Sequence, residues 1–310
     1  MPNLIDQIIA LFKGQPPAPP PPQEARDPDA TVPLPDLPAI KMPMAAPPVD
    51  EGSARRLTIG VAQDVGRVRN HNEDVLLYFT AELAGLEPMP HFGLFIVADG
   101  MGGHSLGERA SGVAARTIAQ TVLESILPSL LADPRADTDR PALKEVMEKA
   151  MEVANRKVHE AVPEGGTTAT CALSLGEQVI FSHVGDSRAY IITDSSFEQA
   201  TRDHSLVQRL VELGQLSPAE AAVHHQKNVL YKALGQGDGL EVDVDSRRLP
   251  PGAKLLLCSD GLWNLVPDEK IEAIIRGTPS LQGACEEMVD AANAAGGPDN
   301  ITAVIIQLPR

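Results

Sequence analysis

Cysteine is scarce in this sequence. Its 310 residues include three cysteines, Cys171, Cys258 and Cys285, which lie far apart and form no CxxC pair. That number and spacing argue against a disulfide framework or a zinc ribbon and favour a reducing, cytoplasmic setting. Aromatic residues are also few, at 3% of the chain, so we expect an interior built mainly from aliphatic side chains.

Basic residues are outnumbered by acidic ones. Lys and Arg total 26 against 42 Asp and Glu, which gives a formal net charge of −16. Because phosphate backbones are bound by basic surfaces, this balance argues against nucleic acid as a partner. No apolar run approaches the roughly 20 residues of a membrane-spanning helix, and the first residues lack the basic start and cleavage site of a secretory signal. We therefore predict no transmembrane span.

The N-terminal region differs from the rest of the chain. Residues 1–14 space their apolar side chains as in one short amphipathic helix. Docking on a partner, contact with a membrane surface and fraying are the alternatives for this helix. Residues 15–54 include 13 prolines between Pro16 and Pro48, a composition that cannot form a packed core and predicts a disordered linker. A folded domain is expected over residues 55–310.

The folded region mixes short apolar runs with longer helical segments. Strands are predicted at Leu57–Asp64, Asp74–Phe79, Gly93–Ala98, Thr168–Leu175, Gln178–Val184, Ser187–Thr193, Lys254–Cys258 and Ile301–Leu308, and helices near Leu106–Leu131, Pro141–Ala161, Asp268–Arg276 and Leu281–Ala295. Consecutive strands followed by helices indicate antiparallel sheets with helices packed outside. LSLGEQVIF and VGDSRAYII are each interpreted as tight links between neighbouring antiparallel strands. Residues 201–235 interrupt the pattern and are predicted to form a mobile insertion.

Acidic residues recur at the ends of the predicted strands. Asp99, Asp186 and Asp260 follow apolar runs, whereas Glu73, Asp74 and Asp299 precede them. Strand ends that meet at one edge of a core would bring these carboxylates together, where a cation or protons must offset their repulsion. Hard divalent cations such as Mg²⁺ or Mn²⁺ prefer oxygen ligands. Independent turns, each capped by its own aspartate, are the alternative interpretation.

Six segments carry a family likeness in their order along the chain. They are GVAQDVGRVRNHNEDVLL, IVADGMGGH, GGTTATCAL, VGDSRAYII, LLLCSDGLW and GGPDNITAVII. Together they resemble the metal-dependent serine/threonine protein phosphatases of type 2C, and DGMGGH is closer to the bacterial branch. The likeness extends from about Arg56 to Leu308. It implies an α+β fold in which two antiparallel sheets are flanked by helices, a four-layer α/β/β/α sandwich.

The resemblance also implies an activity. The chain is expected to be a phosphoprotein phosphatase, a hydrolase that cleaves phosphoserine and phosphothreonine esters through a metal-activated water. Its cofactors would be two Mn²⁺ or Mg²⁺ ions, with a third, weaker ion beside them. Its partners would be phosphorylated proteins, made by a cognate serine/threonine kinase. A docking contact of the N-terminal segment is a separate expectation, which rests on its amphipathic pattern and not on the resemblance. No cysteine lies in a CxxxxxR loop, which argues against a thiol-based phosphatase.

Residue roles follow from the same resemblance. Asp99 would bridge two metals, Gly100 would offer its carbonyl to one of them, and Asp260 and Asp299 would complete the ligands of the other. Glu73 and Asp74 would act chiefly through metal-bound water, Asp186 would bind the third ion, and Arg69 would grip the substrate phosphate. Asp99, Asp260 and Arg69 form the expected catalytic set, and residues 201–235 correspond to a flap beside the cleft.

The general acid is the open assignment. Met101 stands where eukaryotic relatives place a histidine directly after the bridging Asp-Gly pair. His104, three residues further on, is one candidate to protonate the leaving group, and metal-bound water is the other. A catalytically silent phosphoprotein-binding module is the competing function, against which the intact acidic set argues.

Overall fold

The computed structural model describes residues 56–82, 90–102, 105–132, 142–237 and 239–309. All of them fall within one compact unit, Val49–Arg310. The predicted amphipathic segment at residues 1–14, the linker at residues 15–54 and His104 lie outside the described residues, so the expectations about them stay predictions. Among the described residues, no helix combines the length and the apolar character needed to cross a membrane.

Two antiparallel sheets form the centre of the fold. One has the order β1-β11-β10-β7-β8, with β1 at Thr58–Asp64, β11 at Ile301–Gln307, β10 at Lys254–Cys258, β7 at Arg188–Ile192 and β8 at Phe197–Gln199. The other has the order β2-β3-β5-β6-β9, with β2 at Asp74–Ala81, β3 at Phe92–Met101, β5 at Ala169–Leu175, β6 at Gln178–Val184 and β9 at Asp243–Arg248. The short strand β4, Gly166–Thr167, pairs with β3. The predicted strands therefore form, and in antiparallel sheets.

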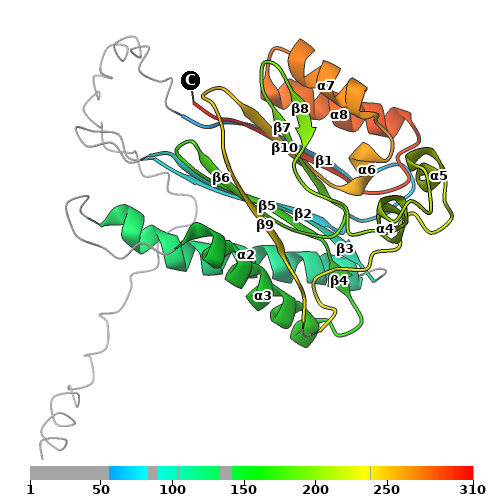
Figure 1. Ribbon diagram of the computed structural model, residues 1–310, viewed down its shortest axis with the longest axis horizontal. Helices are drawn as coiled ribbons and strands as arrows, with labels where there is room; N and C mark the ends of the chain where they lie inside the picture. Colours follow the sequence, from blue (N-terminus) through cyan, green and yellow to red (C-terminus); the bar gives the residue numbers. More distant parts are fainter. Residues whose placement is uncertain (1–55, 83–89, 103–104, 133–141, 238, 310) are drawn as a thin grey trace, which may run out of the picture. The chain divides into compact units, whose positions relative to one another are not determined.

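Helices cover the outer face of each sheet (Figure 1). The helices α2 (Ser105–Leu131) and α3 (Leu143–Ala161) pack on the sheet that contains β3, whereas α7 (Asp268–Gly277) and α8 (Leu281–Ala294) pack on the sheet that contains β10. The single turn of α6 (Asp260–Trp263) follows β10 directly, and α4 (Leu206–Glu212) and α5 (Pro218–Ala222) lie in the segment between β8 and β9. The result is the predicted four-layer α/β/β/α sandwich.

Strand alternation divides the core into three apolar layers. On β3, Leu94 and Ile96 pack with α2 and α3, whereas Phe95 and Val97 point into the space between the two sheets. On β10, Leu256 faces the α7 and α8 side and Leu255 faces the other sheet. Successive side chains of a strand point to opposite faces, so strands covered on both sides read as continuous apolar runs. Each large side chain buried in this way contributes about 1.5–3 kcal/mol.

Three strands were not predicted, and one link was misinterpreted. The strands β4 and β8 are very short, and β9 has the polar sequence DVDSRR, so none carries an apolar pattern. LSLGEQVIF does join the neighbours β5 and β6. VGDSRAYII does not join neighbours: β6 and β7 belong to different sheets, and Gly185 (φ 113°) allows the chain to pass from one to the other.

Gly60 on β1 tests the contact between this strand and the start of α8. A Cβ atom at Gly60 would lie 2.2 Å from the carbonyl carbon of Leu281, so Gly60→Ala must displace backbone. We expect it to lower the free energy of unfolding by about 2 kcal/mol or more, measured by urea denaturation. Gly277→Ala at the end of α7, where a Cβ meets nothing within 4 Å, is the control and should change stability by about 0.5 kcal/mol at most. Equal effects of the two substitutions would contradict this packing.

Candidate functional site

The strand ends that carry the predicted acidic residues meet at one end of the sandwich. On the antiparallel pair β2–β3, Asp74 lies directly opposite Asp99. Because β10 and β11 are also antiparallel neighbours, the end of β10 and the start of β11 lie together and bring Asp260 close to Asp299. The carboxylates from these separate motifs thus share one region of the fold.

One cavity of about 300 Å³ collects most of the predicted site residues. The predicted residues that line it are Arg69, Glu73, Asp99, Gly100, Asp186, Asp260 and Asp299. Thr168, Asn228, Leu230 and Gln236 also line it, so the predicted flap contributes to its wall. Asp74 does not line this cavity and lies buried beside it. The interpretation of the acidic residues as independent turns is therefore wrong for this group.

Asp99 is fixed by backbone contacts as well as by its strand. Its N–H donates to Thr168 Oγ1 at 3.0 Å, and its carbonyl accepts from the Thr168 N–H and the Thr167 hydroxyl, both at 2.8 Å. The next residue, Gly100, allows a close approach of α2, because a Cβ there would lie 2.2 Å from the carbonyl oxygen of Gly107. A larger residue would push α2 away from the site.

Asp74 is held by two hydroxyl groups. Ser259 Oγ and Thr302 Oγ1 each donate to Asp74 Oδ2 at 2.7 Å. Asp74 Oδ1 is buried and has no hydrogen-bond partner among the described residues. A buried carboxylate oxygen without a donor is costly, so this atom would be stabilised by a cation or an ordered water.

Asn300 ties the Glu73 backbone to the start of β11. Its Oδ1 accepts the Glu73 N–H at 2.8 Å, while its Nδ2 donates to the carbonyls of Val65 and His71, both at 2.9 Å. The Glu73 carbonyl accepts the Ser111 hydroxyl of α2 at 2.6 Å. These bonds hold Glu73, whose side chain is largely buried, against the cavity.

On the other side of the cavity, the Arg69 guanidinium pairs with the Asp299 carboxylate. Arg69 Nη2 lies 2.9 Å from Asp299 Oδ2, and the Arg69 side chain remains 43% exposed, so part of the guanidinium is accessible to a ligand. Asn264 Nδ2 donates to Asp260 Oδ2 at 3.1 Å. Arg69, to which the family resemblance assigned the substrate phosphate, lines the same cavity as Glu73.

Trp263, the single tryptophan of the chain, supports the Asp186 loop. Its indole N–H donates to the Asp186 carbonyl at 3.0 Å. The Arg188 guanidinium lies 3.5 Å from the centre of the Trp263 ring and forms a buried ion pair with Asp203 at 2.8 Å. Trp263 and Arg188 therefore connect the Asp186 loop to Asp203, at the start of the predicted flap.

Burial and mutual repulsion make these carboxyl groups hard to ionise. Burial, together with the charges of Asp74 and Asp260, raises the pKa of Asp99 well above its usual value. Burial raises the pKa of Asp74 to about 7 against the opposing hydrogen bonds from Ser259 and Thr302. Burial and the charge of Asp299 raise the pKa of Asp260 to about 6, and burial also raises the pKa of Asp186. Such a site favours protons or a cation.

The donor set fits a hard divalent cation in chemistry. All the candidate ligands are carboxylate or carbonyl oxygens, as Mg²⁺ and Mn²⁺ prefer. In the described part of the chain, however, no three His, Cys, Asp or Glu side chains are arranged to hold a metal ion as they stand. The carboxylates instead accept hydrogen bonds from protein groups. Asp74 accepts from Ser259 and Thr302. Asp260 accepts from Asn264, and Asp299 accepts from Arg69.

Several residues that build the site were missed from the sequence. Thr168, Ser259 and Thr302 contact Asp99 or Asp74. A usable signal existed, because each of these hydroxyl residues lies at a strand end within three positions of a strand-end glycine or a site aspartate. Asn300, which lies next to Asp299, supports the site through its bonds to the backbone of Val65, His71 and Glu73.

Comparisons with known proteins agree with this geometry. The family model described as protein phosphatase 2C matches residues 88–300. The serine/threonine phosphatase stp of Listeria welshimeri is 36% identical over 244 residues, which cover 79% of this chain and 93% of that protein.

Solved structures match over a similar span. The crystal structure of the Mycobacterium tuberculosis serine/threonine phosphatase PstP/Ppp has a TM-score of 0.67 at 32% identity and covers 82% of this chain and 99% of that one. The catalytic domain of PstP in complex with two manganese ions has a TM-score of 0.65 at 30% identity, with coverage of 82% and 99%.

The raised carboxyl pKa values predict how stability depends on pH in the presence of EDTA. Because Asp74 and Asp260 bind protons more tightly when folded than when unfolded, their contribution is fully present below about pH 4 and is lost as the pH rises through about 6 to 7. We expect the free energy of unfolding, measured in urea, to fall across that window, and Asp74→Asn to flatten the decline. Stability that rises with pH over the same window would contradict the assignment.

Proposed function

The chain belongs to the protein phosphatase 2C family, whose members are metal-dependent serine/threonine phosphatases, and on that premise we propose that the cavity around Asp99 is its active site. The proposed reaction is hydrolysis of phosphoserine and phosphothreonine esters in proteins phosphorylated by a serine/threonine kinase. The observation that supports it is the convergence of seven predicted residues from five separate sequence motifs on one cavity.

We propose that two divalent ions, Mn²⁺ or Mg²⁺, occupy this cavity. Asp99 would bridge them, the Gly100 carbonyl would bind one, and Asp260 and Asp299 would bind the other. The PstP neighbour in complex with two manganese ions supports this number. When bound, such ions supply positive charge for the phosphoryl group and lower the pKa of a bound water that can attack phosphorus. Asp186, whose carbonyl accepts the Trp263 indole N–H, is proposed to bind the third, weaker ion.

The protein's own residues orient and neutralise the reactants. Arg69, fixed by Asp299 and still partly exposed, can present a bidentate fork to the substrate phosphate. Asn300 holds the Glu73 backbone, so the Glu73 carboxylate, which lines the cavity, can receive hydrogen bonds from ordered water there. Ser259 and Thr302 hold Asp74 beside the cavity, where its unpartnered Oδ1 can accept a hydrogen bond from a buried water. His104 lies outside the described residues, and its role as the general acid stays a prediction.

Asp99→Asn tests the proposed metal-bridging role. The variant keeps the shape of the side chain but removes a negative charge, so we expect turnover of para-nitrophenyl phosphate in Mn²⁺ to fall about a thousandfold or more. EDTA should abolish turnover by the unmodified protein. Asp194→Asn, on an exposed turn, is the matched control and should retain full activity. Undiminished turnover by Asp99→Asn would contradict the proposal.

Arg69→Ala tests the proposed contact with the substrate phosphate. We expect the KM for a phosphothreonine peptide to rise about tenfold or more, because one charge-assisted contact to the phosphate is lost. Arg67→Ala removes a neighbouring exposed arginine that does not line the cavity and should leave the KM unchanged. The assignment would be wrong if the two substitutions exchanged these effects.

A further inference from the structure

A second recess, larger than the catalytic cavity, lies beside it. Its volume is about 600 Å³, and it is lined by residues of the flap and of the segment leading into β9. Gln236 lines both the recess and the catalytic cavity. Leu230 lines the catalytic cavity, and the next two residues, Tyr231 and Lys232, line the recess. One short stretch of backbone therefore separates the two spaces.

Hydrogen bonds tie the floor of the recess to the loop that contains Gly185. The His204 N–H donates to the Gly185 carbonyl at 2.7 Å, and the Gly185 N–H donates back to His204 Nδ1 at 3.1 Å. The Tyr231 N–H donates to the His204 carbonyl at 2.9 Å. Because Gly185 precedes Asp186, the recess is anchored to the same loop that reaches the catalytic cavity.

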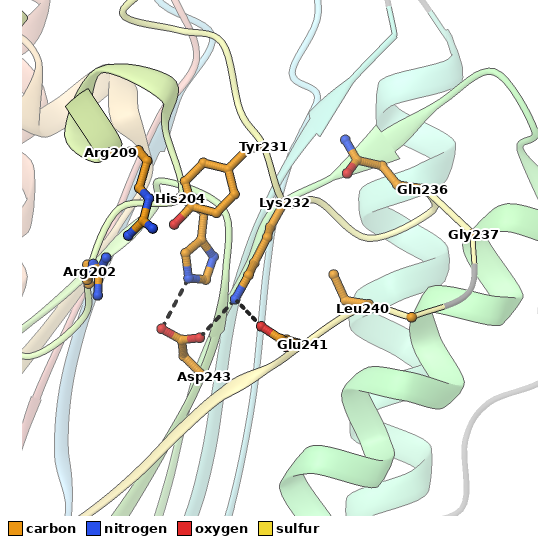
Figure 2. A pocket seen from close by; sticks show the side chains of 11 residues that line it. Arg202, His204, Arg209, Tyr231, Lys232, Gln236, Gly237, Leu240, Glu241 and Asp243 are labelled. Carbon is orange, nitrogen blue, oxygen red and sulfur yellow. Dashed lines mark hydrogen bonds and ion pairs between the residues drawn. The ribbon is translucent and has the colours of Figure 1, made fainter. Parts of the chain in front are cut away.

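The charged groups of one wall of the recess contact one another. His204 is 1% exposed, and its Nε2 lies 3.1 Å from Asp243 Oδ2. Lys232 Nζ lies 3.3 Å from Asp243 Oδ1 and 3.8 Å from Glu241. Figure 2 shows Lys232 reaching toward both carboxylates. These contacts hold the Lys232 charge within the wall, so the lysine is not the group that faces a ligand.

The opposite wall carries surplus positive charge. Arg202 and Arg209 both pair with a single oxygen, Oε2 of Glu212, and their side chains are 52% and 54% exposed. Figure 2 shows the two guanidinium groups on the same side of the recess, near the Tyr231 ring. Two arginines that share one carboxylate leave about one positive charge without a counter-ion. This is notable in a chain whose net charge is −16, which would otherwise repel acidic substrates.

We propose that this recess is a specificity site that binds a second anionic group of the phosphoprotein substrate through Arg202 and Arg209. The inference rests on the proposed function, because the first phosphate must occupy the cavity lined by Arg69 and Asp99. Because Gln236 lines both spaces and an extended peptide advances about 3.3 Å per residue, the second group would lie close in sequence to the phosphorylated residue. A carboxylate and a second phosphate share the required chemistry, since guanidinium groups bind both.

Peptide kinetics test the recess and separate the two sources of the anion. One set of phosphothreonine peptides carries a glutamate at each position near the phosphothreonine, a second carries a non-hydrolysable phosphonate residue there, and a neutral peptide is the reference. For the unmodified protein we expect kcat/KM to be about tenfold higher for the best anionic peptide than for the neutral one. Arg202→Gln/Arg209→Gln should remove this preference while leaving para-nitrophenyl phosphate turnover unchanged.

Arg248→Gln is the matched control. Arg248 is an exposed arginine on β9 that also pairs with a carboxylate, Glu177, away from the recess, and its loss should leave the preference intact. The proposal is overturned if the unmodified protein shows no preference for either anionic set, or if the double variant and Arg248→Gln lose it equally. A preference for one set alone identifies the source of the anion and supports the site.

Direct binding distinguishes failure of the recess from failure of the proposed activity. Fluorescence anisotropy with a labelled phosphonate analogue of the best anionic peptide measures binding without turnover. Absence of hydrolysis would refute the proposed function, whereas the recess is supported if the double variant still weakens binding of the peptide about tenfold. Equal binding by the double variant and the unmodified protein would overturn the recess whatever the activity.

Discussion

Burial and mutual repulsion raise the pKa values of Asp74, Asp99, Asp186 and Asp260, so these side chains cannot all be charged in one cavity without cost. These four carboxyl groups stay close together because each lies at or near the end of a strand, and the apolar layers of the sandwich hold those strands in place. A cation would reverse the effect of their proximity, because the charges that repel one another would all be attracted to it. The acidic site is thus a costly part of the fold, and metal binding would stabilise it.

Neutral polar residues make this arrangement specific. Thr168 fixes Asp99, Ser259 and Thr302 fix Asp74, and Asn300 fixes the Glu73 backbone. All these residues lie in strands or at strand ends, so the sheets hold the carboxylates in place. The flap contributes in a different way: its exit residues line both the catalytic cavity and the neighbouring recess. The proposed active site and the proposed specificity site therefore lie on different elements that share one boundary.

The accuracy of prediction followed the strength of the local pattern. The strands β3, β5, β10 and β11 are buried on both faces and were predicted to within a few residues, because continuous apolar runs bounded by turn residues have few other interpretations. The polar strand β9 was missed, since it forms only by pairing with β6. The passage from β6 to β7 was misinterpreted because a four-residue offset between apolar runs looks the same whether the chain turns back or crosses to another sheet.

The sequence by itself determined the layers, the family likeness and the acidic residues that belong to the site, since each rests on local periodicity or on a contiguous motif. Only the tertiary structure decided that Asp74 lies opposite Asp99, that Ser259 and Thr302 meet on one carboxylate oxygen, and that Arg202 and Arg209 share Glu212. These contacts join residues from different strands and loops, and their geometry depends on sheet register and on how the flap folds back. No local pattern encodes that geometry, because it is a property of the packed chain.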